Sequence, residues 1–249
     1  REGGGHMKKS YGILLIIIAA AAGIFFFQRG IMDRGEQIVS EKKAAEDKIF
    51  EDPKFSNPME NVHEGSNWKR LYQNEFDALE NPTECTGAHW DMQGEEMELF
   101  VKDHLEKWGG GDWKEMKESL YNVGIDGNEE TYYSLRYEWY KQKEDQDKDF
   151  VEVSVDRDAV SGRLHGVMMF IPFKEDAKMV FTDVMEKLGT ETDESGRIFE
   201  EIYKKLKQLG DNRNITYEDK GFRIYMLEQD DVHGMKKDKK YYISIQPSE

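Results

Sequence analysis

The chain has 249 residues, of which 38% are hydrophobic and 35% charged, and its formal net charge is −16. Apart from one apolar run near the start, this is the composition of a soluble globular protein that is rich in charge. Counted on the printed sequence, residues 67–249 hold 41 acidic and 26 basic side chains and therefore carry −15 of that charge. Because nucleic-acid backbones and anionic lipid headgroups are also negative, we expect no nucleic-acid partner. Basic proteins or divalent cations are accommodated more easily.

The first residues have the order of an export signal. Met7 is followed by Lys8 and Lys9 and then by an apolar run. We expect residues 1–10 to be a cytoplasmic leader in which synthesis starts at Met7, because the glycine run before it resembles the translated ribosome-binding site of a bacterial gene. The two lysines favour leaving the N-terminus in the cytoplasm.

Residues 11–32 are predicted to be a transmembrane anchor. The 17 residues from Tyr11 to Phe27 carry no charge. As a helix they reach about 25 Å, and the next five residues extend this toward the roughly 30 Å of hydrocarbon in a bilayer. The alternative is a signal cleaved among the alanines at 19–22, but the mature chain would then begin with the apolar residues 24–27. We therefore favour an uncleaved, single-pass signal-anchor.

Residues 33–66 are predicted to be a stalk followed by a linker. Apolar residues between Ile38 and Ile49 are spaced as one narrow stripe of a helix, which could pair with a copy of itself in a homodimer. Two prolines and several polar residues after that stripe are typical of a linker. We expect the remaining residues, 67–249, to fold as one acidic extracytoplasmic domain.

Apolar spacing predicts helices in the first part of this domain, then strands, two amphipathic helices and further strands. The segments with helical spacing at the start are 68–79, 97–108 and 113–120. The segments that follow are the strands 131–140, 150–155 and 164–173, the helices 177–188 and 198–209, and the strands 215–217, 222–228 and 241–246. The order βββ-αα-βββ also hints at two related halves.

The sequence thus predicts an α+β fold. Its centre is an antiparallel sheet of about six strands with helices packed on one face. A helical segment and the N-terminal transmembrane helix precede the sheet.

Two groups of side chains have the chemistry of metal ligands. One is a carboxylate run that matches the first three positions of a calcium loop, but Phe150 stands where that loop needs glycine, so a hairpin tip is the favoured interpretation. The other contains zinc-ligand side chains without the spacing of a zinc site. These groups are Asp145, Asp147 and Asp149, and Glu84, Cys85, His89 and Asp91. No metal or cofactor site is predicted from them.

No catalytic motif stands out in the sequence, and a non-enzyme is the favoured interpretation. The chain has no serine on a glycine-flanked elbow, and its glycine run at 109–111 lacks the lysine of a phosphate loop. His165 lies in a predicted strand where Val167 and Met169 would share its side, so we expect it to be buried with a shifted ionisation. A hydrogen-bonded core histidine is the favoured role, and no residue is assigned a catalytic one.

Aromatic residues crowd the predicted strand 131–140 on both of its faces. Tyr132, Arg136 and Tyr140 would share the outer face, and tyrosine and arginine are favoured at protein contacts. We therefore treat these three residues as a candidate partner-binding surface. The alternative is that helices from residues 68–120 cover that face.

These observations favour a membrane-anchored binding or interaction module of a bacterial cell envelope. The N-terminus would lie in the cytoplasm and the domain outside, where it would meet a protein or cell-wall partner. Two alternatives stay open at this point: an envelope hydrolase that uses acidic residues, and an assembly component that dimerises through its stalk.

Overall fold

The computed structural model describes residues 43–44, 46–57, 68–82, 84, 88–109, 113–124, 131–141, 151–209, 214–230 and 239–248. The chain divides into two compact units, Arg1–Lys48 and Ile49–Glu249. In the first unit the described residues 43, 44 and 46–48 are helical. The predicted anchor, residues 11–32, lies outside the described ranges. Within those ranges no helix is both long and apolar enough to cross a membrane.

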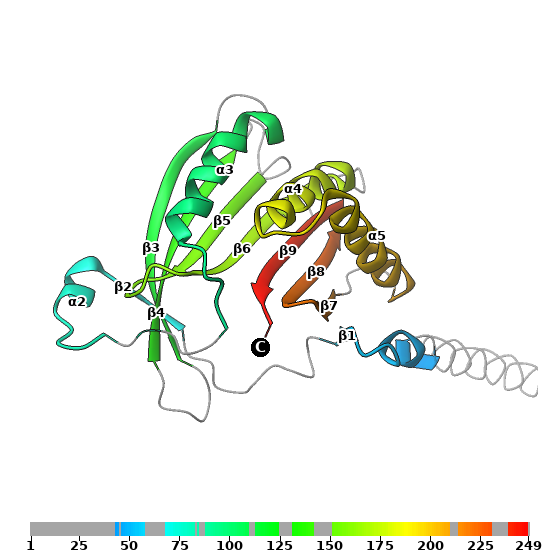
Figure 1. The fold of residues 1–249 in the computed structure, drawn as a ribbon, viewed down its shortest axis with the longest axis horizontal. Coiled ribbons are helices and arrows are strands. Elements are labelled where there is room, and N and C mark those ends of the chain that lie inside the picture. The colour runs from blue at the N-terminus through cyan, green and yellow to red at the C-terminus, as the bar shows by residue number, and fades with distance from the viewer. Residues whose placement is uncertain are drawn as a thin grey trace, which may run out of the picture. The chain divides into compact units, whose positions relative to one another are not determined.

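The second unit is an antiparallel sheet with helices packed against it (Figure 1). In chain order the elements are β1 (Phe55–Ser56), β2 (Trp68–Leu71), α2 (Gln73–Asp77), α3 (Gly94–Gly109), β3 (Lys114–Gly124), β4 (Thr131–Lys141), β5 (Val151–Asp158), β6 (Leu164–Ile171), α4 (Lys174–Lys187), α5 (Thr192–Leu209), β7 (Asn214–Asp219), β8 (Phe222–Asp230) and β9 (Lys239–Pro247). The strand order among the described residues is β1-β7-β8-β9-β6-β5-β4-β3-β2. Seven longer strands, β3–β9, therefore form the sheet, and the two short strands lie at its edges.

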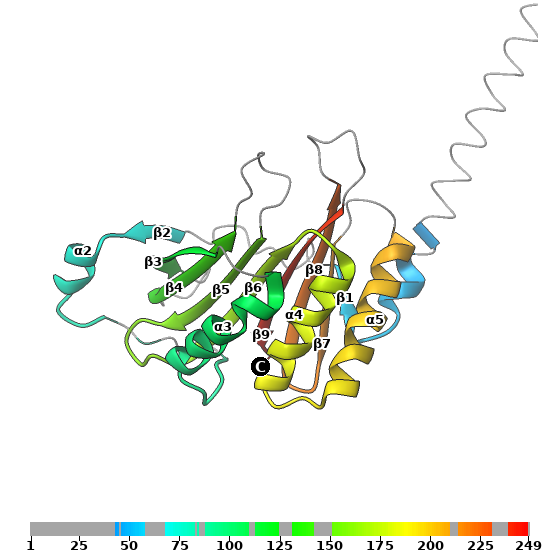
Figure 2. The same cartoon turned by 90° about the horizontal axis from the view of Figure 1, so that it is seen from above.

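The helices α3, α4 and α5 lie on the same side of the sheet (Figure 2). Successive side chains of a strand point to opposite faces, so every second residue of the central strands meets these helices. Val153, Val167, Ile243 and Ile245 are fully buried there, and the helices contribute residues such as Phe181 to the same core. Burial of this continuous apolar layer is the main force that holds the helices on the sheet.

The predicted α+β class and the second half of the element order are confirmed. Strands β4–β6, helices α4 and α5 and strands β7–β9 all fall where the sequence patterns placed them. Two predictions in the first half are wrong. Residues 113–120 were expected to be helical but belong mostly to β3, and residues 68–71 form β2 instead of the first turn of a helix.

The reason for both errors is long-range pairing. Trp68 of β2 pairs with Val123 of β3, and β3 pairs along most of its length with β4. The β2–β3 ladder joins segments that are distant in sequence, and the β3–β4 ladder joins two consecutive strands across a turn. A short apolar run has no periodicity strong enough to distinguish helix from strand, so the tertiary partner decides.

The folded unit begins ahead of the predicted domain start at Asn67. Ile49 and Phe55, which the sequence placed in the stalk and linker, are each only 3% exposed and belong to the hydrophobic core. Phe55 packs edge-on against Tyr217 at a centroid distance of 5.4 Å, and β1 pairs with β7. An ion pair of 2.8 Å between Lys54 and Asp219 adds to this attachment.

The element order invites comparison of α3-β3-β4-β5 with α5-β7-β8-β9, each a helix followed by a three-stranded meander. The pairings make β3 and β7 run in the same direction, while the two meanders approach β6 from opposite edges of the sheet. Both helices cover the same face (Figure 2). Two units arranged in this way are mirror images in topology, and no rotation superposes them. The segments α3-β3-β4-β5 and α5-β7-β8-β9 are therefore not a structural duplication of each other.

Candidate functional site

The face of the sheet opposite α3, α4 and α5 carries side chains that do not belong in a purely solvated layer. We call it the open face; its central members are Arg136, Glu152, Ser154, Asp156, Met168, Phe170, Tyr225, Tyr242 and Ser244. An antiparallel sheet with one packed face usually turns polar side chains outward on the other. Here methionine and aromatic residues occupy that outward position, which marks the face for closer inspection.

Strand pairing arranges these residues in rows across the sheet. One row runs from Tyr140 through Glu152 and Phe170 to Tyr242. The next row contains Ser154, Met168 and Ser244, so two of its positions carry small side chains. Large residues beside small ones leave a hollow.

The hollow has a volume of about 350 Å³, and its walls come from β4, β5, β6 and β9. It is lined by Arg136, Glu152, Met168, Met169, Phe170 and Tyr242. This volume lies at the lower end of the range of ligand pockets, about 300–1,000 Å³. It is large enough to take one bulky side chain or one small molecule.

Arg136 forms the polar end of the hollow through a two-point ion pair with Asp156. The guanidinium Nε donates to Oδ1 at 2.6 Å, and Nη2 donates to Oδ2 at 2.8 Å. The side chains are 28% and 17% exposed, so the pair is partly shielded from water. Such a fork-to-carboxylate geometry fixes both side chains.

Met168 is held between two donors on the floor of the hollow. Nη2 of Arg136 lies 3.7 Å from its sulfur, and the hydroxyl of Tyr242 donates to the same sulfur at 2.9 Å. Burial raises the pKa of the Tyr242 hydroxyl, and the positive charge of Arg136 opposes that rise. Since the net direction is upward, the hydroxyl stays protonated and keeps donating at neutral pH.

The rings of the hollow already have partners within the protein. Tyr225 and Tyr242 meet in a T-shaped contact at 5.8 Å. The ammonium of Lys240, a residue only 9% exposed, lies 5.5 Å from the centroid of the Phe170 ring. One face of Phe170 is therefore occupied by a cation, and Tyr242 is fixed by its neighbour.

The structure places the three predicted binding residues as follows. Arg136 lines the hollow, and Tyr140 lies beside Glu152 on the same face. The backbone of Tyr132 lies in β4 opposite Val123, but its side chain is outside what the structure describes. Helix α3 packs on the other face, against β5 and β6, so it does not cover Arg136 in the way the alternative prediction required.

Sequence reasoning missed the remaining lining residues of the hollow. Met168 and Phe170 belong to a segment that is apolar on both faces, and such a segment gives no signal for which side is outward. Tyr242 and Glu152 come from strands whose neighbours become known only when the sheet order is known. The one available signal was the apolar outer face of residues 164–173.

His165 does not take the predicted place beside Val167 and Met169. The β5–β6 register shifts at this point, because Asp156 pairs with Gly166 while the next residue, Arg157, pairs with Leu164. His165 is the extra residue of this bulge and is only half-buried. Burial nevertheless lowers its pKa, against the opposing effect of the Asp158 and Asp156 carboxylates, which is the direction expected for a histidine shielded from water.

The candidate metal groups fall largely outside the described residues, which include neither Cys85 nor the carboxylate run at 145–149. Of the remaining candidates, His89 contacts Arg163. Within the described ranges, no three His, Cys, Asp or Glu side chains come together in a way that could hold a metal ion.

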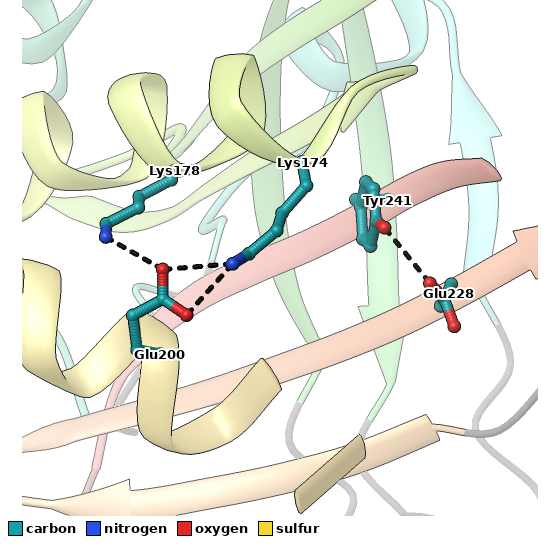
Figure 3. Close-up of polar contacts among 5 residues, drawn as sticks. All are labelled: Lys174, Lys178, Glu200, Glu228 and Tyr241. Atoms are coloured by element: carbon teal, nitrogen blue, oxygen red, sulfur yellow. Dashed lines mark hydrogen bonds and ion pairs between the residues drawn. The ribbon is translucent and has the colours of Figure 1, made fainter. Parts of the chain in front are cut away.

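A second polar cluster lies on the packed face, between α4, α5 and the strands β8 and β9 (Figure 3). The carboxylate of Glu228 is 1% exposed and accepts from Tyr241 at 3.0 Å and from Lys207 at 2.9 Å. Glu200 of α5 accepts from Lys174 and Lys178 of α4. These bonds join both helices to each other and α5 to the sheet, so we interpret the cluster as structural.

Comparison with protein-family models, with curated proteins and with solved structures gives no match. The function is therefore argued from the surface itself. Of the two polar arrangements, the structural cluster consists of ion pairs and hydrogen bonds that join helices and strands, whereas the hollow on the open face has a volume that another molecule can enter.

Proposed function

We propose that this chain is a membrane-anchored binding module of a bacterial cell envelope, and that it holds its partner on the open face of the sheet. Residues 11–32 would cross the membrane once, with the N-terminus in the cytoplasm and the folded unit outside. The observation that carries the proposal is the hollow of about 350 Å³ lined by methionine, aromatic and arginine side chains on the face that the long helices leave uncovered.

The composition of the hollow supports binding. Aromatic residues, methionine and arginine are enriched at protein interfaces, and methionine adapts to partners of varied shape. Arg136 and Met168 are already fixed by bonds within the protein, so little side-chain entropy is lost when a partner arrives. A rigid, partly apolar surface of this kind can bind a partner without catalysing a reaction.

Photo-crosslinking in whole cells tests this proposal. A photoreactive phenylalanine analogue replaces Tyr140 on the open face, and a matched variant carries it at Lys204, an exposed residue of α5. We expect a discrete adduct from position 140 and none from position 204. Met168→Asp and, separately, Phe170→Ala should each abolish the adduct while leaving the thermal unfolding of the protein cooperative. An adduct that forms at position 204 alone, or that survives both substitutions, would overturn the proposal.

A further inference from the structure

The ring contacts of the hollow restrict the kind of group that can enter it. A sugar is usually bound by stacking on a free aromatic face, but one face of Phe170 is occupied by Lys240 and Tyr242 is engaged by Tyr225. What remains as floor is the thioether of Met168 and the edges of these rings. Thioethers and ring edges pack well against a flexible aliphatic or aromatic side chain. The hollow therefore suits a protein side chain better than a glycan ring.

The charged side chains around the hollow indicate the net charge of the protein segment that would bind there. Arg136 and Glu152 line the hollow itself, Asp156 pairs with Arg136, and the described residues Glu138 and Lys240 lie at neighbouring positions of the open face. Arg136 is neutralised by its two-point pair with Asp156, and Lys240 is only 9% exposed. Glu152 is therefore the acidic group of the lining, and it lies beside a cation whose charge is already compensated by Asp156.

The charge of the whole unit acts in the same direction. Residues 67–249 carry −15 of the total of −16, so the long-range field attracts cations and repels anions. Fields of this kind raise the association rate of a complementary partner and fall with ionic strength. The net charge of the unit thus favours a basic partner.

We propose that the hollow receives a single apolar side chain from a basic protein segment, one in which that side chain is flanked by lysine or arginine. This inference rests on the proposed function of the open face and narrows its partner. The apolar side chain packs on Met168 between Phe170 and Tyr242, and a flanking cation lies near Glu152 at the edge of the hollow.

Selection from a library of random nine-residue peptides tests the inference on the full chain in detergent. Enriched peptides should pair one aliphatic or aromatic residue with a neighbouring Lys or Arg. A fluorescently labelled enriched peptide then serves as the probe, and its dissociation constant is measured by fluorescence anisotropy. Glu152→Lys should weaken binding about tenfold or more at low salt, since it reverses the charge beside the ligand's cation. The matched substitution Glu191→Lys, at an exposed position between α4 and α5, should change it less than about threefold.

The outcomes separate this inference from the broader proposal. Enrichment of acidic or purely polar peptides, or equal effects of Glu152→Lys and Glu191→Lys, contradicts the basic-segment inference even if crosslinking from position 140 succeeds. Enriched basic peptides whose binding is unchanged by Phe170→Ala would bind elsewhere and contradict it as well. No enrichment together with binding of a soluble cell-wall glycan fragment to the open face also overturns it and leaves the binding module in place. Absence of a crosslink from position 140 in cells would contradict both the basic-segment inference and the proposed binding function.

Discussion

Single side chains on the open face are positioned by contacts inside the protein. Arg136 is held by Asp156, Met168 by Arg136 and Tyr242, and Tyr242 by its T-shaped contact with Tyr225. Each contact is small, but together they leave few rotamers open. Binding of the proposed partner would therefore require little further ordering of these side chains.

Glu228 provides a residue-scale test of the structural cluster on the packed face. Glu228→Gln removes a charge that is 1% exposed and that accepts from Lys207 and Tyr241. We expect the free energy of unfolding to fall by about 2 kcal/mol, less than for a fully buried pair because the Lys207 side chain, 37% exposed, can reach water. Denaturant unfolding of the full chain in detergent measures this.

Glu218→Gln is the matched control for that substitution. Glu218 also pairs with a cation, Arg223, but the two side chains are 40% and 46% exposed. The free energy of unfolding should change by less than about 0.5 kcal/mol, as for most surface pairs. Equal effects of the two substitutions would show that Glu228 is not the buried charge described above.

The lowered pKa of His165 predicts a pH dependence of stability. Burial favours the neutral ring in the folded state, whereas the unfolded chain takes up a proton near the ordinary value of 6.5. The stabilising contribution is therefore complete above pH 6.5 and is lost as the pH falls below it. Nuclear magnetic resonance of the His165 ring should show a titration midpoint below 6.5; a midpoint above it would contradict the assigned burial.

At the scale of elements, long periodic segments could be predicted from the sequence and short paired ones could not. The helices α4 and α5 were predictable because their apolar residues recur at helical spacing over several turns, and Gly189 ends α4 with a left-handed φ of 97°. Strand β3 was missed because its neighbour β4 lies beyond an intervening turn and supplies the hydrogen bonds that decide its conformation. The bulge at His165 was invisible for the same reason.

The candidate site was predictable only in part, because it too depends on which strands are neighbours in the sheet. Arg136 and Tyr140 could be chosen because alternation within β4 separates its two faces. Met168, Phe170 and Tyr242 join them only through the strand order β9-β6-β5-β4, which no local pattern contains. A surface assembled from several strands cannot be recognised until the order of the strands in the sheet is known.

Substitution of two helical glycines by alanine tests the packing of α3 and α5, because we expect the two changes in the free energy of unfolding to have opposite signs. A Cβ at Gly94 would lie 2.5 Å from Cβ of Arg157, so Gly94→Ala should force α3 away from β5 and lower the free energy of unfolding by about 1–3 kcal/mol. A Cβ at Gly196 in α5 meets only Cε of Lys178 at 3.9 Å, so Gly196→Ala should raise it by about 0.5–1 kcal/mol. Thermal unfolding of the two variants would contradict this packing if both shifts had the same sign.

At the scale of the whole molecule, the N-terminal entry of the folded unit and the hollow lie at different parts of the sheet. The chain enters the folded unit at Ile49 and β1, which pairs with β7 at one edge of the sheet, while the hollow lies over β4, β5, β6 and β9. Helices seal the opposite face with an apolar core. The proposed function requires this arrangement, in which the described long helices lie on the face opposite the hollow.

Labelling with a membrane-impermeant maleimide tests the central claim most directly. In a Cys85→Ser background, a single cysteine is placed either at Tyr140 on the open face or at Lys204 on α5. In intact cells, the cysteine at 204 should react at the rate found for purified protein, because the unit lies outside the membrane. The cysteine at 140 should react several-fold more slowly than in purified protein, because a partner covers the open face. A rate at position 140 that is the same in intact cells as in purified protein would show that nothing covers the open face. No reaction at either position until the cells are lysed would place the unit in the cytoplasm.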